Sequence, residues 1–141
     1  NVLADFFSES EINRAKEISK QFVKSHYQFN GDQPNEHIEK ASQFVTDDLK
    51  AKMTTNLIVR PTNDNYRRRI VGLEVYESYN PTSKEFLNLI ARVKGEVLNI
   101  EGEITKREMV EYDLKLVPFE DTFRINEYTY KSLNYKEQGK E

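Results

Sequence analysis

Two hydrophobic periodicities follow one another along this chain, and their order constrains the fold more than any other feature. Over residues 8–54, apolar side chains recur every three or four positions, which is the spacing of one face of an α-helix. From Arg69 onward, apolar and polar side chains alternate, which is typical of strands with one buried face. Helices that precede a run of strands, instead of alternating with them, favour an α+β fold. We therefore predict two or three N-terminal helices packed on a strongly curved antiparallel sheet of about four strands.

The helical region carries its own start and stop signals. Ser8-Glu9-Ser10-Glu11 has the pattern of a capping box, in which serine and glutamate side chains bond the free amides of the first turn. Asn30-Gly31-Asp32 is expected to end this helix, because Asn and Gly tolerate the left-handed conformation at a helix end. Pro34 suits the first turn of a second helix. Thr46-Asp47-Asp48 suits the cap of a short third helix that carries Leu49.

Turn residues divide the second half of the chain into strands. The expected strands cover residues 69–79, 86–97, 107–117 and 122–133. Asn80-Pro81-Thr82-Ser83 and Pro118-Phe119-Glu120-Asp121 are the expected turns between them. Leu57-Ile58-Val59 is a candidate for a further short edge strand. Gly95 and Gly102 are expected to mark bulges or bends that curl the sheet.

The length of 141 residues fits one domain that is large enough to bury a core. We expect residues 1–141 to form that single domain, with an ordered core over about 8–134 and a flexible polar tail at 136–141. Both the helical stripes and the strand faces contribute to the expected core. Its members are predicted to be Ile12, Ile18, Phe22, Phe44, Leu49, Leu89, Ala91, Tyr112, Leu114, Leu116 and Ile125.

Charge and cysteine content exclude several classes of function. The net charge is −3, whereas a dedicated nucleic-acid binder normally has a basic excess, so we expect no direct nucleic-acid contact. The chain has no cysteine, which excludes disulfides, thiolate metal sites and a cysteine nucleophile. This composition is compatible with an extracytoplasmic protein that does not rely on disulfides. Residues 1–7 begin without Met and read like sequence continuing from upstream, so we expect an excised domain whose membrane anchor precedes it.

No residue pattern identifies a reaction. His26 and His37 lie beside polar residues on the expected helices, and an exposed or helix-end position is the favoured interpretation for both. Asp113 alternates with apolar neighbours and is expected to point away from the core. Four glutamates lack the spacing of a calcium loop and are interpreted as solvated hairpin charges; these are Glu96, Glu101, Glu103 and Glu108. We predict no catalytic, cofactor-binding or metal-binding residue.

Two groups of residues are candidates for contact with a partner protein. The first is the only dense basic run of the chain, which consists of Tyr66, Arg67, Arg68 and Arg69. A solvated strand edge is the simpler interpretation of this run, because basic side chains on an edge also discourage aggregation. The second group is Tyr128 and Tyr130 on the last strand. Core packing is the simpler interpretation there, but tyrosines left outside a core make effective contact surfaces.

Several stretches resemble a known family. They are the helix that carries Phe22 and Tyr27, the segment Phe44-Val45-Thr46-Asp47-Asp48-Leu49, and the terminal strand Phe123-Arg124-Ile125-Asn126-Glu127-Tyr128. In this order the elements resemble the cystatin-like cone of the nuclear-transport-factor-like superfamily. Within it they look most like the extracytoplasmic domains of conjugative type IV secretion components in Gram-positive mobile elements. The Asn-, Lys- and Tyr-rich composition also fits a low-GC Gram-positive host.

This resemblance implies a non-enzymatic scaffold domain of a conjugative DNA-transfer channel. It would be tied to the cell membrane by an upstream segment, exposed on the cell-wall side, and would bind other channel proteins and itself, without a cofactor. Two alternatives remain open from the sequence. One is a small-ligand-binding or isomerase-type member of the same fold, which needs a pocket with a desolvated acid or base. The other is an extracytoplasmic lipoprotein domain of unrelated role.

Overall fold

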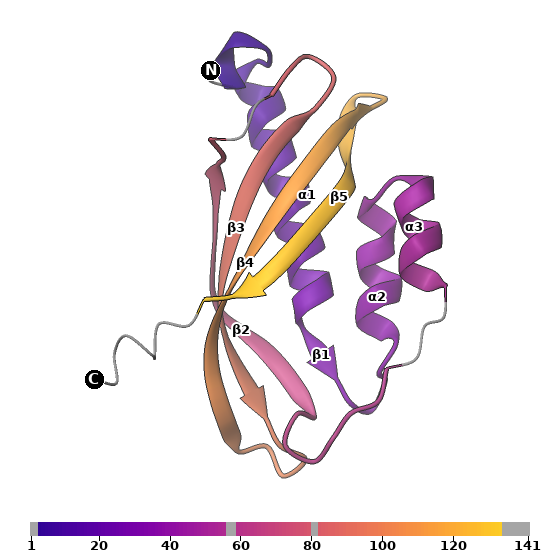
Figure 1. The fold of residues 1–141 in the computed structure, drawn as a ribbon, viewed down its shortest axis with the longest axis vertical. Coiled ribbons are helices and arrows are strands. Elements are labelled where there is room, and N and C mark those ends of the chain that lie inside the picture. The colour runs from indigo at the N-terminus through magenta and orange to yellow at the C-terminus, as the bar shows by residue number, and fades with distance from the viewer. Residues whose placement is uncertain (1–2, 56–58, 80–81, 134–141) are drawn as a thin grey trace, which may run out of the picture.

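A computed structural model describes residues 3–55, 59–79 and 82–133 of the chain (Figure 1). In chain order the elements are a 3₁₀ turn η1 (Leu3–Asp5), α1 (Glu9–Tyr27), β1 (Phe29–Asn30), α2 (Glu36–Ala41), a 3₁₀ turn η2 (Ser42–Phe44), α3 (Asp47–Thr54), β2 (Arg67–Glu77), β3 (Leu87–Leu98), β4 (Ile104–Phe119) and β5 (Thr122–Ser132). The strands form one sheet in the order β1-β2-β3-β4-β5, and every neighbouring pair is antiparallel. The predicted α+β fold is therefore confirmed, with five strands in place of about four.

The first helix begins where the capping box predicts. The Glu11 amide donates to Ser8 Oγ at 3.1 Å, and the Ser8 amide donates to Glu11 Oε1 at 2.8 Å. The helix ends at Tyr27, before the predicted stop at residues 30–32, because the chain turns into β1 there. This two-residue strand pairs Phe29 with Arg68 and accounts for the additional strand.

The two shorter helices lie together on the β5 side of the sheet (Figure 1). α2 starts two residues after Pro34, and its N-terminal flanking residue Asn35 makes no side-chain cap bond. α3 starts as predicted, with Thr46 Oγ1 accepting a hydrogen bond from the Leu49 amide at 3.3 Å. The segment before α3 is tied to the sheet, because the Thr46 amide donates to the Ile125 carbonyl at 2.9 Å.

The core lies between α1 and the face of the sheet that α1 covers, which we call the inner face (Figure 1). Eight of the eleven predicted core residues are buried, while Ile18, Phe44 and Leu49 are only partly buried against them. The core also includes residues beyond those eleven, several of them on the same helical stripes and strand faces. These are Leu3, Phe7, Ala15, Val23, Tyr27, Ala41, Val45, Leu87, Val93, Val110 and Phe123.

One bulge of the sheet lies beside a predicted glycine, Gly95, and the others do not lie at glycines. The pairing register shifts on β2 between Ile70 and Gly72, and further shifts interrupt the β3–β4 and β4–β5 ladders. Gly95 flanks the β2 bulge on the partner strand, because it pairs with Ile70 and its neighbour Lys94 pairs with Gly72. Its missing side chain also makes room for Tyr27: an added Cβ would lie 2.0 Å from the Tyr27 hydroxyl oxygen. Gly102 is in the β3–β4 turn with φ of 89°, a conformation that glycine adopts without steric cost.

The structure describes only some of the turns that the sequence predicts between strands. β4 continues through Phe119, so the predicted turn at 118–121 narrows to Glu120 and Asp121. Some predicted segments fall wholly or partly outside the described residues. These are the candidate strand at 57–59, the turn at 80–83, and the C-terminal residues with Tyr135 and the polar tail.

Helix and sheet differ in length, and this difference creates the site described below. The 19 residues of α1 span about 28 Å, whereas the 16 residues of β4 have a contour of about 53 Å. α1 therefore cannot cover the whole inner face. The N-terminal half of β4 and the ends of β3 and β5 extend beyond Tyr27, and a concave surface remains open there.

Candidate functional site

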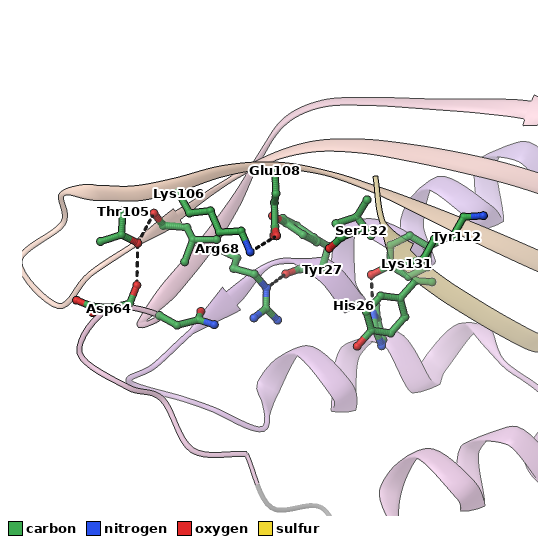
Figure 2. Close-up of a pocket in the computed structure, with 14 residues that line it drawn as sticks. His26, Tyr27, Asp64, Arg68, Thr105, Lys106, Glu108, Tyr112, Lys131 and Ser132 are labelled. Carbon is green, nitrogen blue, oxygen red and sulfur yellow. Dashed lines mark hydrogen bonds and ion pairs between the residues drawn. The ribbon is translucent and has the colours of Figure 1, made fainter. Parts of the chain in front are cut away.

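The uncovered end of the inner face forms a pocket of about 720 Å³ (Figure 2). Its floor comes from the last turn of α1, and its walls come from β2, β3, β4, β5 and the segment before β2. The lining residues are His26, Tyr27, Asp64, Asn65, Arg68, Val97, Thr105, Lys106, Glu108, Val110, Tyr112, Tyr130, Lys131 and Ser132. This volume lies within the range of small-molecule sites in proteins.

His26 joins three elements at the pocket floor. Its Nδ1 lies 2.7 Å from the Tyr112 hydroxyl on β4, and its Nε2 lies 3.2 Å from the Tyr128 hydroxyl on β5. Burial, with smaller contributions from nearby His37 and Arg68, lowers the pKa of His26 to about 3. The ring is therefore neutral at physiological pH, and one nitrogen donates while the other accepts. Burial raises the pKa of both tyrosine hydroxyls, so they also remain neutral.

Both histidines lie at helix ends, as one of the two interpretations held, but the exposure expected for them is wrong. His26 is 7% exposed and His37 is 9% exposed, with their ring centroids 6.3 Å apart. His37 packs edge-on against Phe29, and burial lowers its pKa. The error has a physical origin: the polar neighbours in sequence point elsewhere, while His26 follows Phe22 at helical spacing and falls on the same buried stripe.

A hydrogen-bonded pair forms the wall between α1 and β4. The Tyr27 hydroxyl donates to Glu108 Oε2 at 2.5 Å, and Lys106 Nζ lies 3.6 Å from the other oxygen of the same carboxylate. Glu108 and Glu96 are only 12% and 14% exposed at their side chains, so the interpretation of these two as solvated charges is wrong. Glu101 and Glu103 are exposed as predicted.

The basic run does not form one patch, because successive strand residues point to opposite faces. Arg68 lies on the inner face, where its Nε donates to the Tyr27 carbonyl at 3.0 Å and its guanidinium lies over the rings of Tyr27 and Phe29. Arg67 and Arg68 are only partly exposed and Arg69 is exposed, so the interpretation as a solvated strand edge holds fully only at Arg69.

Arg67 and Arg69 point to the other face and are both neutralised. Arg67 pairs with Asp32 at 2.8 Å, and the same aspartate accepts a hydrogen bond from the Tyr66 hydroxyl. Arg69 pairs with Glu96 at 2.8 Å.

The outer face of the sheet carries rows of alternating charge. One row crosses four strands in register, with Glu74, Arg92, Glu111 and Lys131 as successive neighbours. Asp113 also lies on this face, as predicted from its alternation with apolar residues. Opposite charges placed as cross-strand neighbours stabilise a sheet modestly and leave no large field of one sign.

Of the two candidate tyrosines of β5, Tyr130 lines the pocket and Tyr128 lies behind it, against His26. Tyr128 is half-buried and bonds His26. Tyr130 is 58% exposed and stacks on Tyr112, with ring centroids 5.3 Å apart and an interplanar angle of 24°. The structure thus brings Arg68, Tyr128 and Tyr130 into one region, and it separates them from Tyr66, Arg67 and Arg69.

The site offers hydrogen-bond donors and aromatic surface rather than an arranged metal or acid–base centre. Among residues 3–55, 59–79 and 82–133, no group of three His, Asp or Glu side chains is arranged to hold a metal ion. His26 has both nitrogens occupied by tyrosines, and the Glu108 carboxylate is occupied by Tyr27 and Lys106. In the same part of the chain, no helix is long and apolar enough to cross a membrane.

The curved sheet wrapped around one long helix, with a pocket at its open end, defines a nuclear-transport-factor-like fold, as the resemblance predicted. A solved structure described as an Ntf2-like protein involved in plasmid conjugation is similar, with a TM-score of 0.62 and 9% identity over 86% of this chain. This chain spans about half of that protein, 48% of its length.

Two further solved structures are similar, and one of them, TrwG, is described as a component of a type IV secretion system. VirB8 of Agrobacterium tumefaciens matches with a TM-score of 0.57 and 10% identity, over 90% of this chain and 96% of that one. The TrwG component from Bartonella birtlesii matches with a TM-score of 0.53 and 10% identity, over 86% and 91%. The sequence itself matches no protein family and no characterised protein. At such low identity these similarities show the fold alone.

Proposed function

We propose that this chain is a non-enzymatic assembly domain of a conjugative type IV secretion channel. The observation that carries the proposal is the similarity in fold to VirB8 and TrwG, which extends over nearly the whole length of all three chains. Folds of this kind host several functions, so the fold by itself only raises the expectation. The arrangement of the pocket supports a non-enzymatic role, because its histidine and its half-buried glutamate are both held by neighbouring side chains.

The location follows as part of the same proposal. We place the domain on the extracytoplasmic side of a Gram-positive cell membrane, tied there by a segment upstream of residue 1. The absence of cysteine is compatible with this location. Partners would be other proteins of the channel and further copies of this chain. An isomerase-type role or an extracytoplasmic lipoprotein of another role remain the alternatives, and a lipobox cysteine upstream would favour the second.

The outer face and its edge are the surfaces that we propose for these contacts. Tyr66, Arg67 and Arg69 lie together, and Asp32, the partner of Tyr66 and Arg67, is exposed enough to be exchanged for a charge of another protein. Arg69 is itself exposed, although its partner Glu96 is not. Rim charges of this kind steer encounter and fix register, and contribute little to the stability of the fold. Tyr130 offers an exposed ring on the other side of the sheet.

The proposal is tested by deleting the segment that encodes residues 8–133, in frame, in a donor strain. We expect transfer of the mobile element to be lost while its replication and the growth of the donor are unchanged, and we expect the intact gene in trans to restore transfer. Undiminished transfer from the deletion strain would refute the proposal.

A further inference from the structure

The pocket contains a cation, Arg68, for which the described part of the chain supplies no counter-ion. A guanidinium has five N–H donors, and the Nε–H of Arg68 is used by the Tyr27 carbonyl. Within the described residues, no carboxylate lies within ion-pair distance of Arg68, although both neighbours in sequence have one. Figure 2 shows its guanidinium in the middle of the pocket, joined by a dashed line only to Tyr27.

The fold holds this guanidinium in place. It lies 5.5 Å from the centroid of the Tyr27 ring and 4.9 Å from that of Phe29. The Tyr27 ring is in turn fixed by the bond from its hydroxyl to Glu108 and by close contact with Gly95. An arginine whose stem and Nε are fixed presents its remaining donors as a rigid fork, and this geometry matches a carboxylate.

The charges around Arg68 do not compensate it. The Glu108 carboxylate is shared by Tyr27 and Lys106, and Asp64 lies at the opposite rim beyond ion-pair distance from Arg68. Lys131 also lines the pocket, but its ammonium pairs with Glu111 on the outer face at 4.0 Å. Partly buried charges are normally paired in proteins. An unpaired fork that faces a cavity is therefore arranged for an anion that residues 3–55, 59–79 and 82–133 do not supply.

The remaining walls indicate what this anion is attached to. Tyr112 and Tyr130 stack on one another, and the outer ring of this pair, Tyr130, leaves 58% of its surface exposed. An exposed tyrosine ring beside a cation favours a ligand with a planar apolar body, because aromatic rings pack well against one another. We propose that the pocket binds an aromatic carboxylate, with the Arg68 fork on the carboxylate and the Tyr112–Tyr130 pair against the ring. This site does not depend on the proposed role in secretion.

Such a ligand has two sources, a free aromatic acid or the C-terminal residue of a peptide. The first probe pair is 3-phenylpropionate and its uncharged twin 3-phenylpropionamide. The second is N-acetyl-Gly-Gly-Phe with a free or an amidated C-terminus. Binding to residues 1–141 is measured by NMR titration at physiological salt. We expect saturable binding in the millimolar range or tighter, with at least one acid preferred over its amide by about tenfold. The probe pair with the larger preference for the acid over its amide shows whether the ligand is a free aromatic acid or the C-terminal residue of a peptide.

The variants separate this site from a structural role of the arginine. Arg68→Gln should reduce binding of the acid to the level of the amide, and Arg68→Lys, which keeps the charge without the fork, should fall between. Arg69→Gln is the matched control on the opposite face of the same strand and should bind as the wild type does. Acids and amides that bind equally to the wild type, or an equal loss in Arg68→Gln and Arg69→Gln, would overturn the inference, whatever the stability of the variants.

Discussion

The contact between Gly95 and Tyr27 gives the sharpest prediction about how the pocket is held together. A methyl group at position 95 would lie 2.0 Å from the Tyr27 hydroxyl oxygen and 2.5 Å from Cζ of the same ring, far inside van der Waals contact. The ring must move away, because the other side of the contact is the backbone of a central strand. Its bond to Glu108 is then lost, and a half-buried carboxylate keeps only Lys106.

The cost of Gly95→Ala combines two effects. Overpacking of a close contact typically costs about 1–3 kcal/mol. Loss of a hydrogen bond to a charged group adds about 1.5–3 kcal/mol when the bond cannot re-form. Because displacement of the ring relieves part of the overpacking, we expect the free energy of unfolding to fall by about 3 kcal/mol. For a domain of this size, this corresponds to a melting temperature lower by about 10 °C.

The assay is urea unfolding of purified residues 1–141, with Gly72→Ala as the matched control. Position 72 is also a strand glycine, but an added Cβ there meets only Lys94, at an ordinary 3.8 Å. We expect Gly72→Ala to be neutral or stabilising by up to about 1 kcal/mol.

A double-mutant cycle tests whether Tyr27 is the cause. In a Tyr27→Leu background the clash is absent, so Gly95→Ala should cost at least about 1 kcal/mol less than in the wild type. An equal cost in both backgrounds, or a loss no larger than that of Gly72→Ala, would refute the reasoning.

Three further predictions follow from other contacts. His26 has a pKa of about 3 in the folded state and 6.5 in the unfolded state, so its contribution to the free energy of unfolding is complete above pH 6.5 and is lost progressively toward pH 3. From pH 7 to 5, the free energy of unfolding of the wild type, measured in urea, should therefore fall by about 2 kcal/mol more than that of His26→Gln. Parallel pH profiles of the two proteins would contradict this. Thr46→Ala removes the cap that accepts from the Leu49 amide and should cost about 1 kcal/mol by the same assay, whereas no change would show that the cap is dispensable. The double variant Arg67→Glu/Arg69→Glu should weaken pull-down of channel partners and hardly move the melting curve, and unchanged pull-down would remove this surface from the proposal.

The fold was predictable wherever burial on one face imposes a period on the sequence. The stripe through Ile12, Ala15 and Phe22, and the alternation from Val110 to Leu116, follow directly from this requirement. The short strand β1 (Phe29–Asn30) was missed because a segment of two residues is too short to show any period. The bulge beside Gly95 was anticipated, whereas the bulges of the β3–β4 and β4–β5 ladders were missed because a bulge is a property of the pairing between two strands.

The site was less predictable, although part of the signal was present. Side chains alternate between the two faces along β2, so Arg68 must point to the face opposite to that of Arg67 and Arg69. The spacing from Phe22 to His26 similarly places the histidine on the buried stripe. The partners of these side chains could not be inferred, because Glu108, Tyr112 and Tyr128 approach them only through the register of the folded sheet.

The central claim, that this chain works through contacts within a conjugative channel, is tested most directly by photocrosslinking in donor cells during transfer. A benzophenone amino acid is placed in the full-length protein at exposed Lys94 on the outer face of β3, and in a second strain at exposed Lys20 on the solvent side of α1. The account predicts that the Lys94 position crosslinks to another protein of the same channel, that Lys20 gives a weaker or different product, and that the Lys94 product disappears when the other channel genes are deleted. Cells that transfer normally while neither position crosslinks to any channel protein would contradict it.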